Sequence, residues 1–139
     1  MKVSEIMIRD VATTVSGETL DQAASTMKRR DVGILPVVEN GRIVGVVTDR
    51  DIVVRAVSAA LRPHMTTVRE VMTRSAVCCH EDEDLADVSL LMEKNHIRRV
   101  FVLDHNEKPV GVVSLDDLAV NSRTERVSGH ILSKVCAAG

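Results

Sequence analysis

Aromatic side chains are almost missing from this sequence, which holds one phenylalanine, Phe101, and neither tryptophan nor tyrosine. A hydrophobic core therefore has to be built from aliphatic residues, and the valine-rich runs among them favour strands. With 139 residues, of which 45% are hydrophobic, the chain has the size of one ordinary domain or of two small halves that share a core.

A strong excess of one charge and long apolar runs are also missing. The formal net charge of −2 and the isoelectric point near 6.2 argue against general affinity for nucleic acid or anionic membranes. No apolar run approaches the roughly 20 residues that span a bilayer, and the first residues, MKVSEIMIRD, lack the apolar stretch of a signal peptide. We therefore expect a cytoplasmic protein whose main partner is neither nucleic acid nor a membrane.

Cysteine is sparse and has no regular spacing. Cys78, Cys79 and Cys136 are an odd number, as expected of reduced thiols in a cytosol. The stretch CCHEDED at 78–84 contains residue types that bind zinc, but neighbouring residues on a strand point to opposite faces, so Cys78 and Cys79 are poorly placed to share one ion. We predict no metal site here, but one buried cysteine, one that faces outward, and an acidic helix start.

The sequence motifs of common enzymes are absent as well. There is no G-x-S-x-G, no Walker loop, no H-E-x-x-H and no spaced carboxylate pair on a rigid frame. The five histidines share no pattern; they are His64, His80, His96, His105 and His130. We therefore predict no catalytic residues, no required cofactor and no enzymatic activity.

The chain repeats itself. Shifted by 65 residues, the pattern V-x-E-h-M-x-R at 3–9, in which h is an apolar residue and x any residue, falls on 68–74. After one inserted residue near 106–108 the shift becomes 66, and VGVV at 44–47 falls on VGVV at 110–113. A match of this length with one gap indicates a tandem repeat. We assign 1–58 to repeat 1, 59–67 to a linker, 68–120 to repeat 2 and 121–139 to a tail that is either a short helix or disordered.

The sequence pattern of each repeat predicts strands and helices in the order β-α-β-β-α. Strands at 11–15 and 76–79 precede helices that begin near Leu20, after a Thr19-x-x-Gln22 capping box, and near Leu85. Hairpins follow at 34–38 with 43–47 and at 99–103 with 110–113, and helices at 49–58 and 115–120 close the repeats. We expect an α/β (α+β) fold in which the two repeats, related by a pseudo-two-fold axis, pack sheet to sheet, because one small apolar face cannot be buried alone.

The closing helices begin with Thr48-x-x-Asp51 and Ser114-x-x-Asp117. One interpretation is a capping box, in which the hydroxyl accepts a backbone N–H and the acid reaches back. The other is a ligand site, because a helix N-terminus attracts anions, a hydroxyl can donate to phosphate and a carboxylate can accept both hydroxyls of a ribose. The two interpretations are partly compatible, and the residues alone leave both open.

The doubled β-α-β-β-α pattern, with VGILPVVENGRIVGVVT in one copy and IRRVFVLDHNEKPVGVVS in the other, resembles the CBS domain, named after cystathionine β-synthase. The resemblance covers about residues 3–120. It implies a regulatory pair that binds an adenosine-containing ligand (AMP, ADP, ATP, NAD or S-adenosylmethionine), and it favours the ligand interpretation of the two motifs. Because no controlled enzyme or transporter domain accompanies the pair, we expect signalling in trans to an unknown target protein. The alternative is a ligand-independent module for protein interaction or dimerisation.

In this family the ligand lies between the two repeats, so each motif is completed by the other copy. The resemblance implies a site 1 made of Val46, Thr48, Asp51, Ala76, Val77, Ile97 and Arg99. It implies a site 2 made of Val11, Ala12, Val32, Ile34, Val112, Ser114 and Asp117. Alternation along the strand sends Arg98 and Arg99 to opposite faces, so only Arg99 is assigned to the ligand's phosphate.

Apolar residues on the closing helices exceed what one buried face needs. These residues are Ile52, Val53, Val54, Val57, Leu118 and Val120. A contiguous apolar patch marks an interface, and CBS pairs often associate through their helices, so we predict a homodimer.

Overall fold

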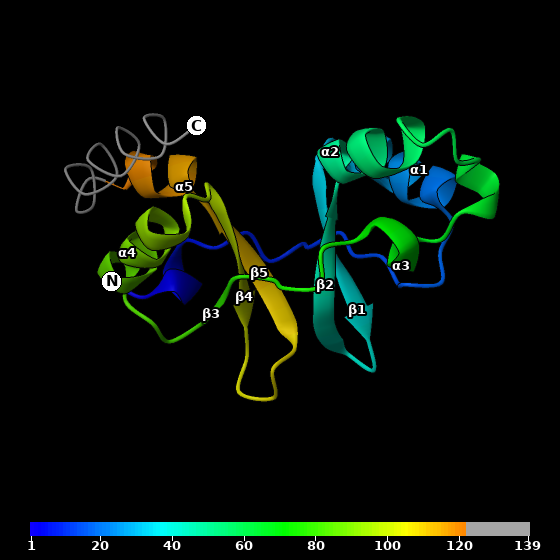
Figure 1. Cartoon of the computed structure of the whole chain (residues 1–139). Coiled ribbons are helices and arrows are strands. Elements are labelled where there is room, and N and C mark those ends of the chain that lie inside the picture. The colour runs from blue at the N-terminus through cyan, green and yellow to red at the C-terminus, as the bar shows by residue number, and fades with distance from the viewer. Residues whose placement is uncertain (122–139) are drawn as a thin grey trace. The chain divides into compact units, whose positions relative to one another are not determined.

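The chain crosses twice between two packing units in the computed structural model, which describes residues 1–121 (Figure 1). Unit 2 comprises Ala12–Ala76, and unit 1 comprises Met1–Val11 together with the chain from Val77 onward. The predicted tail begins at residue 121, and the rest of it, which includes His130 and Cys136, lies outside the described residues. Within residues 1–121 no helix has the length and apolar character needed to cross a membrane.

Unit 2 contains one hairpin and five helical segments. Its elements are α1 (Leu20–Arg30), β1 (Ile34–Glu39), β2 (Arg42–Thr48), α2 (Asp49–Asp51), η2 (Ile52–Val57), η3 (Pro63–Met65) and α3 (Val68–Val71). The predicted helix at 49–58 is formed by α2, which continues into η2. The bond from Ser58 N–H to the Val53 carbonyl (3.1 Å) has the spacing of a π-helical turn.

The start of α1 forms as predicted. The Thr19 N–H donates to Gln22 Oε1 at 3.0 Å, which completes the capping box. Leu20, Ala23 and Met27 are buried on one face of the helix. This spacing places them against the hairpin, so the helix follows directly from its apolar periodicity.

The hairpin of unit 2 also forms as predicted, but the strand expected before it does not. Asn40 (φ 52°) and Gly41 (φ 76°) both have left-handed backbones, as a type I′ turn requires. The segment 11–15 is reduced to a single parallel bridge between Thr14 and Val37, so the sheet has two strands. The prediction of a strand at 11–15 was wrong because the chain turns at once after Thr14, where the Glu18 N–H bonds to the Val15 carbonyl.

Unit 1 has a three-stranded sheet. Its elements are η1 (Val3–Glu5), β3 (Cys78–His80), α4 (Leu85–Asn95), β4 (Arg99–Leu103), β5 (Pro109–Ser114) and α5 (Leu115–Val120). Strand β3 runs parallel to β4, and β4 is antiparallel to β5. The predicted strand at 76–79 therefore forms, beginning two residues later. The turn between β4 and β5 is held by Asp104 Oδ1, which accepts the N–H groups of Asn106 (2.8 Å) and Lys108 (3.0 Å).

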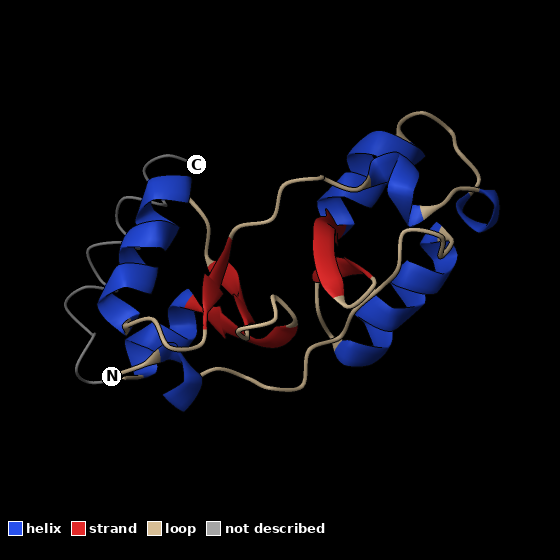
Figure 2. Cartoon of the chain, turned by 90° about the horizontal axis from the view of Figure 1, so that it is seen from below, coloured by secondary structure: helices blue, strands red, loops and turns tan. Residues whose placement is uncertain are grey.

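In each unit the helices lie on one face of the sheet (Figures 1 and 2). Aliphatic side chains fill the space between the two layers, among them Leu20, Leu35 and Val47 in unit 2 and Leu85, Val100 and Val113 in unit 1. The α/β (α+β) class is confirmed. The packing of one sheet on the other and the pseudo-two-fold axis stay predictions.

The opening segments of the two repeats are exchanged between the units. Val68 N–H donates to the Glu18 carbonyl (2.8 Å) in unit 2, and at the equivalent place in unit 1 Val3 N–H donates to the Glu83 carbonyl (2.9 Å). The start of repeat 2 thus completes the core of repeat 1, and the start of repeat 1 completes the core of repeat 2. The boundaries of the sequence repeats and of the packing units are different divisions of the same chain.

The glycine of the repeated VGVV stretch makes room for these exchanged segments. A Cβ on Gly45 would lie 2.5 Å from the Thr73 carbonyl oxygen, and a Cβ on Gly111 would lie 2.5 Å from Met7 Sδ. Beside them, Val46 bridges to Thr73, and Val112 bridges to Ile8. The motif therefore requires glycine because another backbone approaches the strand at this point.

Candidate functional site

Thr48 and Asp51 form a reciprocal pair at the end of β2. The Asp51 N–H donates to Thr48 Oγ1 (3.0 Å), and the Thr48 N–H donates to Asp51 Oδ2 (3.0 Å). Only 13% of the Asp51 side chain is exposed. The capping-box geometry is therefore present, and it leaves the Thr48 hydroxyl proton and the second carboxylate oxygen, Oδ1, outside the box.

Ser114 and Asp117 repeat this arrangement at the end of β5. The Asp117 N–H donates to Ser114 Oγ (3.1 Å), and the Ser114 N–H donates to Asp117 Oδ2 (2.8 Å). A hollow of about 240 Å³ lies beside this acid and is lined by Ile6, Asp117, Val120 and Asn121. Sequence reasoning did not assign Ile6 to this place, because the exchange of the opening segments brings it there.

The strand register places a second predicted residue beside each hydroxyl. Ile34 is the partner of Thr48 on the β1–β2 ladder, and Arg99 is the partner of Ser114 on the β4–β5 ladder. Directly opposite residues share a face of the sheet. Each hydroxyl therefore has a neighbour from its own unit, apolar for Thr48 and cationic for Ser114.

The residues predicted for site 1 are divided between the units. Val46, Thr48, Asp51 and Ala76 belong to unit 2, whereas Val77, Ile97 and Arg99 belong to unit 1. Val46 lies beside the segment that leads to Ala76, because its N–H and carbonyl bond with Thr73 at 2.8 Å each. Arg99 is exposed. The structure thus brings the unit 2 members together, and the completion of site 1 stays a prediction.

Site 2 is divided in the same way. Val11, Val112, Ser114 and Asp117 belong to unit 1, and Ala12, Val32 and Ile34 belong to unit 2. Val112 pairs with Ile8, three residues before Val11. None of the apolar residues predicted for the two sites is among the fully buried core residues; all are partly exposed. In contrast, the neighbouring strand residues Val47 and Val113 have no exposed surface.

Arg55 is a residue near the predicted site that sequence reasoning missed. Its Nη1 donates to the carbonyls of Val71 (2.8 Å) and Met72 (3.2 Å) and lies 3.7 Å from Asp51 Oδ1. The spacing of four residues between Asp51 and Arg55 is a sequence signal for an ion pair on one helix. The contacts with the end of α3 had no such signal, because they join segments that lie far apart in the chain.

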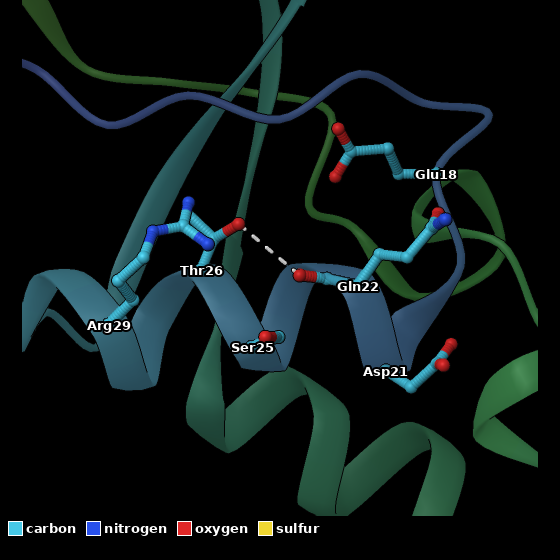
Figure 3. A pocket seen from close by; sticks show the side chains of 6 residues that line it. All are labelled: Glu18, Asp21, Gln22, Ser25, Thr26 and Arg29. Atoms are coloured by element: carbon cyan, nitrogen blue, oxygen red, sulfur yellow. Dashed lines mark hydrogen bonds between the residues drawn. The ribbon is translucent and has the colours of Figure 1, made fainter.

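A second hollow, of about 450 Å³, lies over the outer face of α1 (Figure 3). Its lining is polar and consists of Glu18, Asp21, Gln22, Ser25, Thr26 and Arg29. The drawn hydrogen bond, from Thr26 Oγ1 to the Gln22 carbonyl (3.3 Å), belongs to the helix itself. None of the predicted ligand residues lines this hollow.

The thiols beside the acidic stretch are held in the protonated form. Burial raises the pKa of Cys79 to about 12 and also raises the pKa of Cys78. Cys79 is buried, as predicted for one of the two, but Cys78 is partly buried instead of facing outward. Because the thiolate is the reactive form, neither side chain is an activated nucleophile. Among residues 1–121, no group of three or more acidic, histidine or cysteine side chains is arranged to hold a metal ion.

Comparisons with known proteins identify the repeated unit. The CBS domain family model matches residues 3–58 and 68–122. CBS domain-containing protein YhcV of Bacillus subtilis (strain 168) is 41% identical over 133 residues, which cover 96% of this chain and 94% of that protein.

Two solved structures have the same fold. The CBS domain pair of protein MJ0100, in complex with 5′-methylthioadenosine and S-adenosyl-L-methionine, has a TM-score of 0.74 and 30% identity and covers 86% of this chain and 94% of its own. The CBS domain protein PAE2072 from Pyrobaculum aerophilum, complexed with AMP, has a TM-score of 0.80 and covers 94% of this chain and 99% of its own. At 23% identity the second likeness concerns the fold alone.

Proposed function

The chain belongs to the CBS domain family, and from this premise we propose that it is a regulatory module that binds an adenosine-containing ligand at sites 1 and 2. The observation that carries the proposal is the doubled hydroxyl–carboxylate pair. Thr48 with Asp51 and Ser114 with Asp117 have the same reciprocal hydrogen bonds in both units. In each pair the cap leaves the second carboxylate oxygen, Oδ1, outside the capping box, where it can accept a donor from a ligand.

The chemistry of these pairs suits a ribose. The 2′- and 3′-hydroxyls of a ribose are neighbouring donors, and a carboxylate accepts two donors at once. The cap uses one lone pair of Oδ2 in each acid, so further acceptor positions are left. The partly exposed aliphatic residues predicted for each site offer an apolar surface for adenine, and Arg99 offers a cation for phosphate.

The likeness to the MJ0100 pair supports the ligand class, since that protein was solved with 5′-methylthioadenosine and S-adenosyl-L-methionine. AMP, ADP, ATP, NAD and S-adenosylmethionine all contain adenosine and are the candidate ligands. The ligand acts as a regulatory signal, not as a cofactor of a reaction. Its output is an effect in trans on a separate target protein in the cytoplasm.

A homodimer is part of the proposal. Three valines of η2 have half or more of their surface exposed: Val53 (57%), Val54 (50%) and Val57 (60%). Leu61 and Met65 follow them and are also exposed. Such an apolar stretch suits burial against a second copy. Light scattering should give about twice the chain mass of 15.2 kDa at micromolar concentration, and a monomer would contradict the dimer.

A second candidate function is a ligand-independent interaction module. The cap hydrogen bonds and the exposed valines of η2 favour it, because neither requires a small molecule. A thermal-shift screen with AMP, ADP, ATP, NAD and S-adenosylmethionine separates the two candidates. A ligand at about 100 times its dissociation constant should stabilise the fold by roughly 2.7 kcal/mol. No shift with any of the five compounds would favour the interaction module.

A further inference from the structure

Arg55 contacts three consecutive residues of unit 2 through one guanidinium nitrogen. Nη1 lies within hydrogen-bond distance of the Val71 carbonyl (2.8 Å), the Met72 carbonyl (3.2 Å) and Thr73 Oγ1 (3.2 Å). These acceptors are at and just after the end of α3, where the last carbonyls of a helix have no partner within the helix. A cation at this place satisfies them. Arg55 therefore holds the exchanged opening segment of repeat 2, 68–74, on unit 2.

The same nitrogen lies 3.7 Å from Asp51 Oδ1, one helical turn away. The other oxygen, Oδ2, is held by the Thr48 N–H. The two oxygens of Asp51 are thus directed by different groups, one by the backbone cap and one by Arg55. Because only 13% of its side chain is exposed, Asp51 has little room to adopt another orientation.

The segment held by Arg55 also leads to a predicted adenine contact. Thr73 exchanges two backbone hydrogen bonds with Val46, and Ala76 follows three residues later. Val46, Asp51 and Ala76 are all predicted for site 1. A single side chain therefore fixes the direction of the ribose acceptor and the place of the segment that precedes Ala76.

The described part of unit 1 has a different residue type at this position. The position equivalent to Arg55 is Asn121, a neutral residue. Among residues 1–121, no arginine or lysine pairs with Asp117. Within residues 1–121, an arginine thus pairs with Asp51 but not with Asp117.

We propose that Arg55 is a positioning residue for Asp51, which couples ligand binding at site 1 to the docking of segment 68–74 on unit 2. The inference rests on the proposed function, since it assigns a role within site 1. Ligand binding fixes Asp51, Asp51 fixes Arg55, and Arg55 fixes the end of α3. By linkage, the docked segment favours the bound state to the same degree.

The test uses the full chain with Asp117→Ala as parent, so that site 1 is left to report. Titration calorimetry with AMP and with S-adenosylmethionine should show about fivefold weaker binding for Arg55→Ala, which is about 1 kcal/mol. Arg55→Lys should recover part of the loss, because an ammonium group can still donate to a carbonyl and pair with the acid.

Arg69→Ala is the matched control. Arg69 holds the same segment through Ser16 Oγ (3.0 Å) and Glu39 Oε1 (3.4 Å), but no contact joins it to Asp51. Amide exchange at Val46 and Thr73 without ligand should show that in both variants the segment opens more often but stays docked for most of the time. Only Arg55→Ala should weaken ligand binding by more than about twofold.

Each outcome has a separate meaning. If the parent binds and Arg55→Ala binds as tightly, or if Arg69→Ala loses as much affinity as Arg55→Ala, the positioning role is wrong and the proposed function stands. If neither the wild type nor the parent binds either compound, the proposed function fails and the role of Arg55 at site 1 fails with it.

Discussion

The hydroxyl–carboxylate pairs of the two units have matching hydrogen bonds, whereas the charges around them differ. In unit 2 the acid has Arg55 beside it and the hydroxyl has Ile34 as its ladder partner. In unit 1 the ladder partner of the hydroxyl is Arg99. The backbone geometry thus follows from residues that the repeats share, and the electrostatics follow from single positions at which they diverge. Two pairs with the same hydrogen bonds can therefore prefer different ligands.

The units also differ in which atoms of the exchanged segment approach the glycine of VGVV. Next to Gly45 the nearest atom is a backbone carbonyl oxygen, whereas next to Gly111 it is the sulfur of the Met7 side chain. A backbone cannot move without carrying its neighbours with it. The docking of segment 68–74 on unit 2 should therefore tolerate less change than the docking of segment 3–9 on unit 1.

The largest effect is expected from alanine at these glycines. Gly45→Ala should lower the free energy of unfolding by about 2–3 kcal/mol and Gly111→Ala by about 1 kcal/mol, because overpacking costs more where the neighbour is rigid. Urea denaturation measures both. Gly17→Ala is the control, since a Cβ there meets no atom within 4 Å. Equal losses for all three variants would contradict the close approach.

Arg99→Ala addresses the division of ligands between the sites. In the Asp117→Ala background, which leaves site 1, it should weaken AMP about tenfold and leave adenosine nearly unchanged, since an arginine–phosphate contact is charge-assisted. Titration calorimetry measures this. If the loss occurs instead in the Asp51→Ala background, Arg99 serves its ladder neighbour Ser114 and the assignment to site 1 is wrong. The second site, with Ile34, should prefer the less phosphorylated ligand.

Ser89→Ala compares the two long helices. Ser89 is fully buried in α4, and its hydroxyl has no hydrogen-bond partner in the described part of the chain. The equivalent residue in α1 is Ala24. Removing a buried, unpaired hydroxyl should raise the free energy of unfolding by about 1 kcal/mol. Ser25→Ala, on the exposed face of α1, should change stability little, and a loss of stability in Ser89→Ala would contradict the expectation.

The smallest effect is expected from His80, whose equivalent in unit 2 is Val15. The hydrogen bond to Glu107 (2.7 Å) raises the pKa of His80 above its ordinary value of 6.5. The stabilisation is therefore complete below about pH 6.5 and is lost as the pH rises through the folded-state pKa. Because the pair is exposed, the change should be a few tenths of a kcal/mol. In Glu107→Gln, denaturation between pH 6 and 8 should lack this part of the pH dependence.

Local features of this fold could be predicted from the sequence. The Thr19 cap, the Asn40-Gly41 turn and the two hydroxyl–carboxylate pairs each depend on residues within four positions of one another. The exchange of the opening segments, 3–9 and 68–74, could not be predicted. Both segments have the same pattern, and this pattern does not determine which core each segment joins. Arg55 was missed for a related reason: its partners Val71 and Met72 come from an exchanged segment.

The central claim is that the two hydroxyl–carboxylate pairs bind an adenosine-containing ligand. Titration calorimetry with S-adenosylmethionine and AMP on the wild type, Asp51→Ala, Asp117→Ala and the double variant tests it most directly. The account predicts two sites, one, one and none, with each substitution costing about 1 kcal/mol of stability or less through its cap. A double variant that is folded and binds either compound as tightly as the wild type would contradict the account.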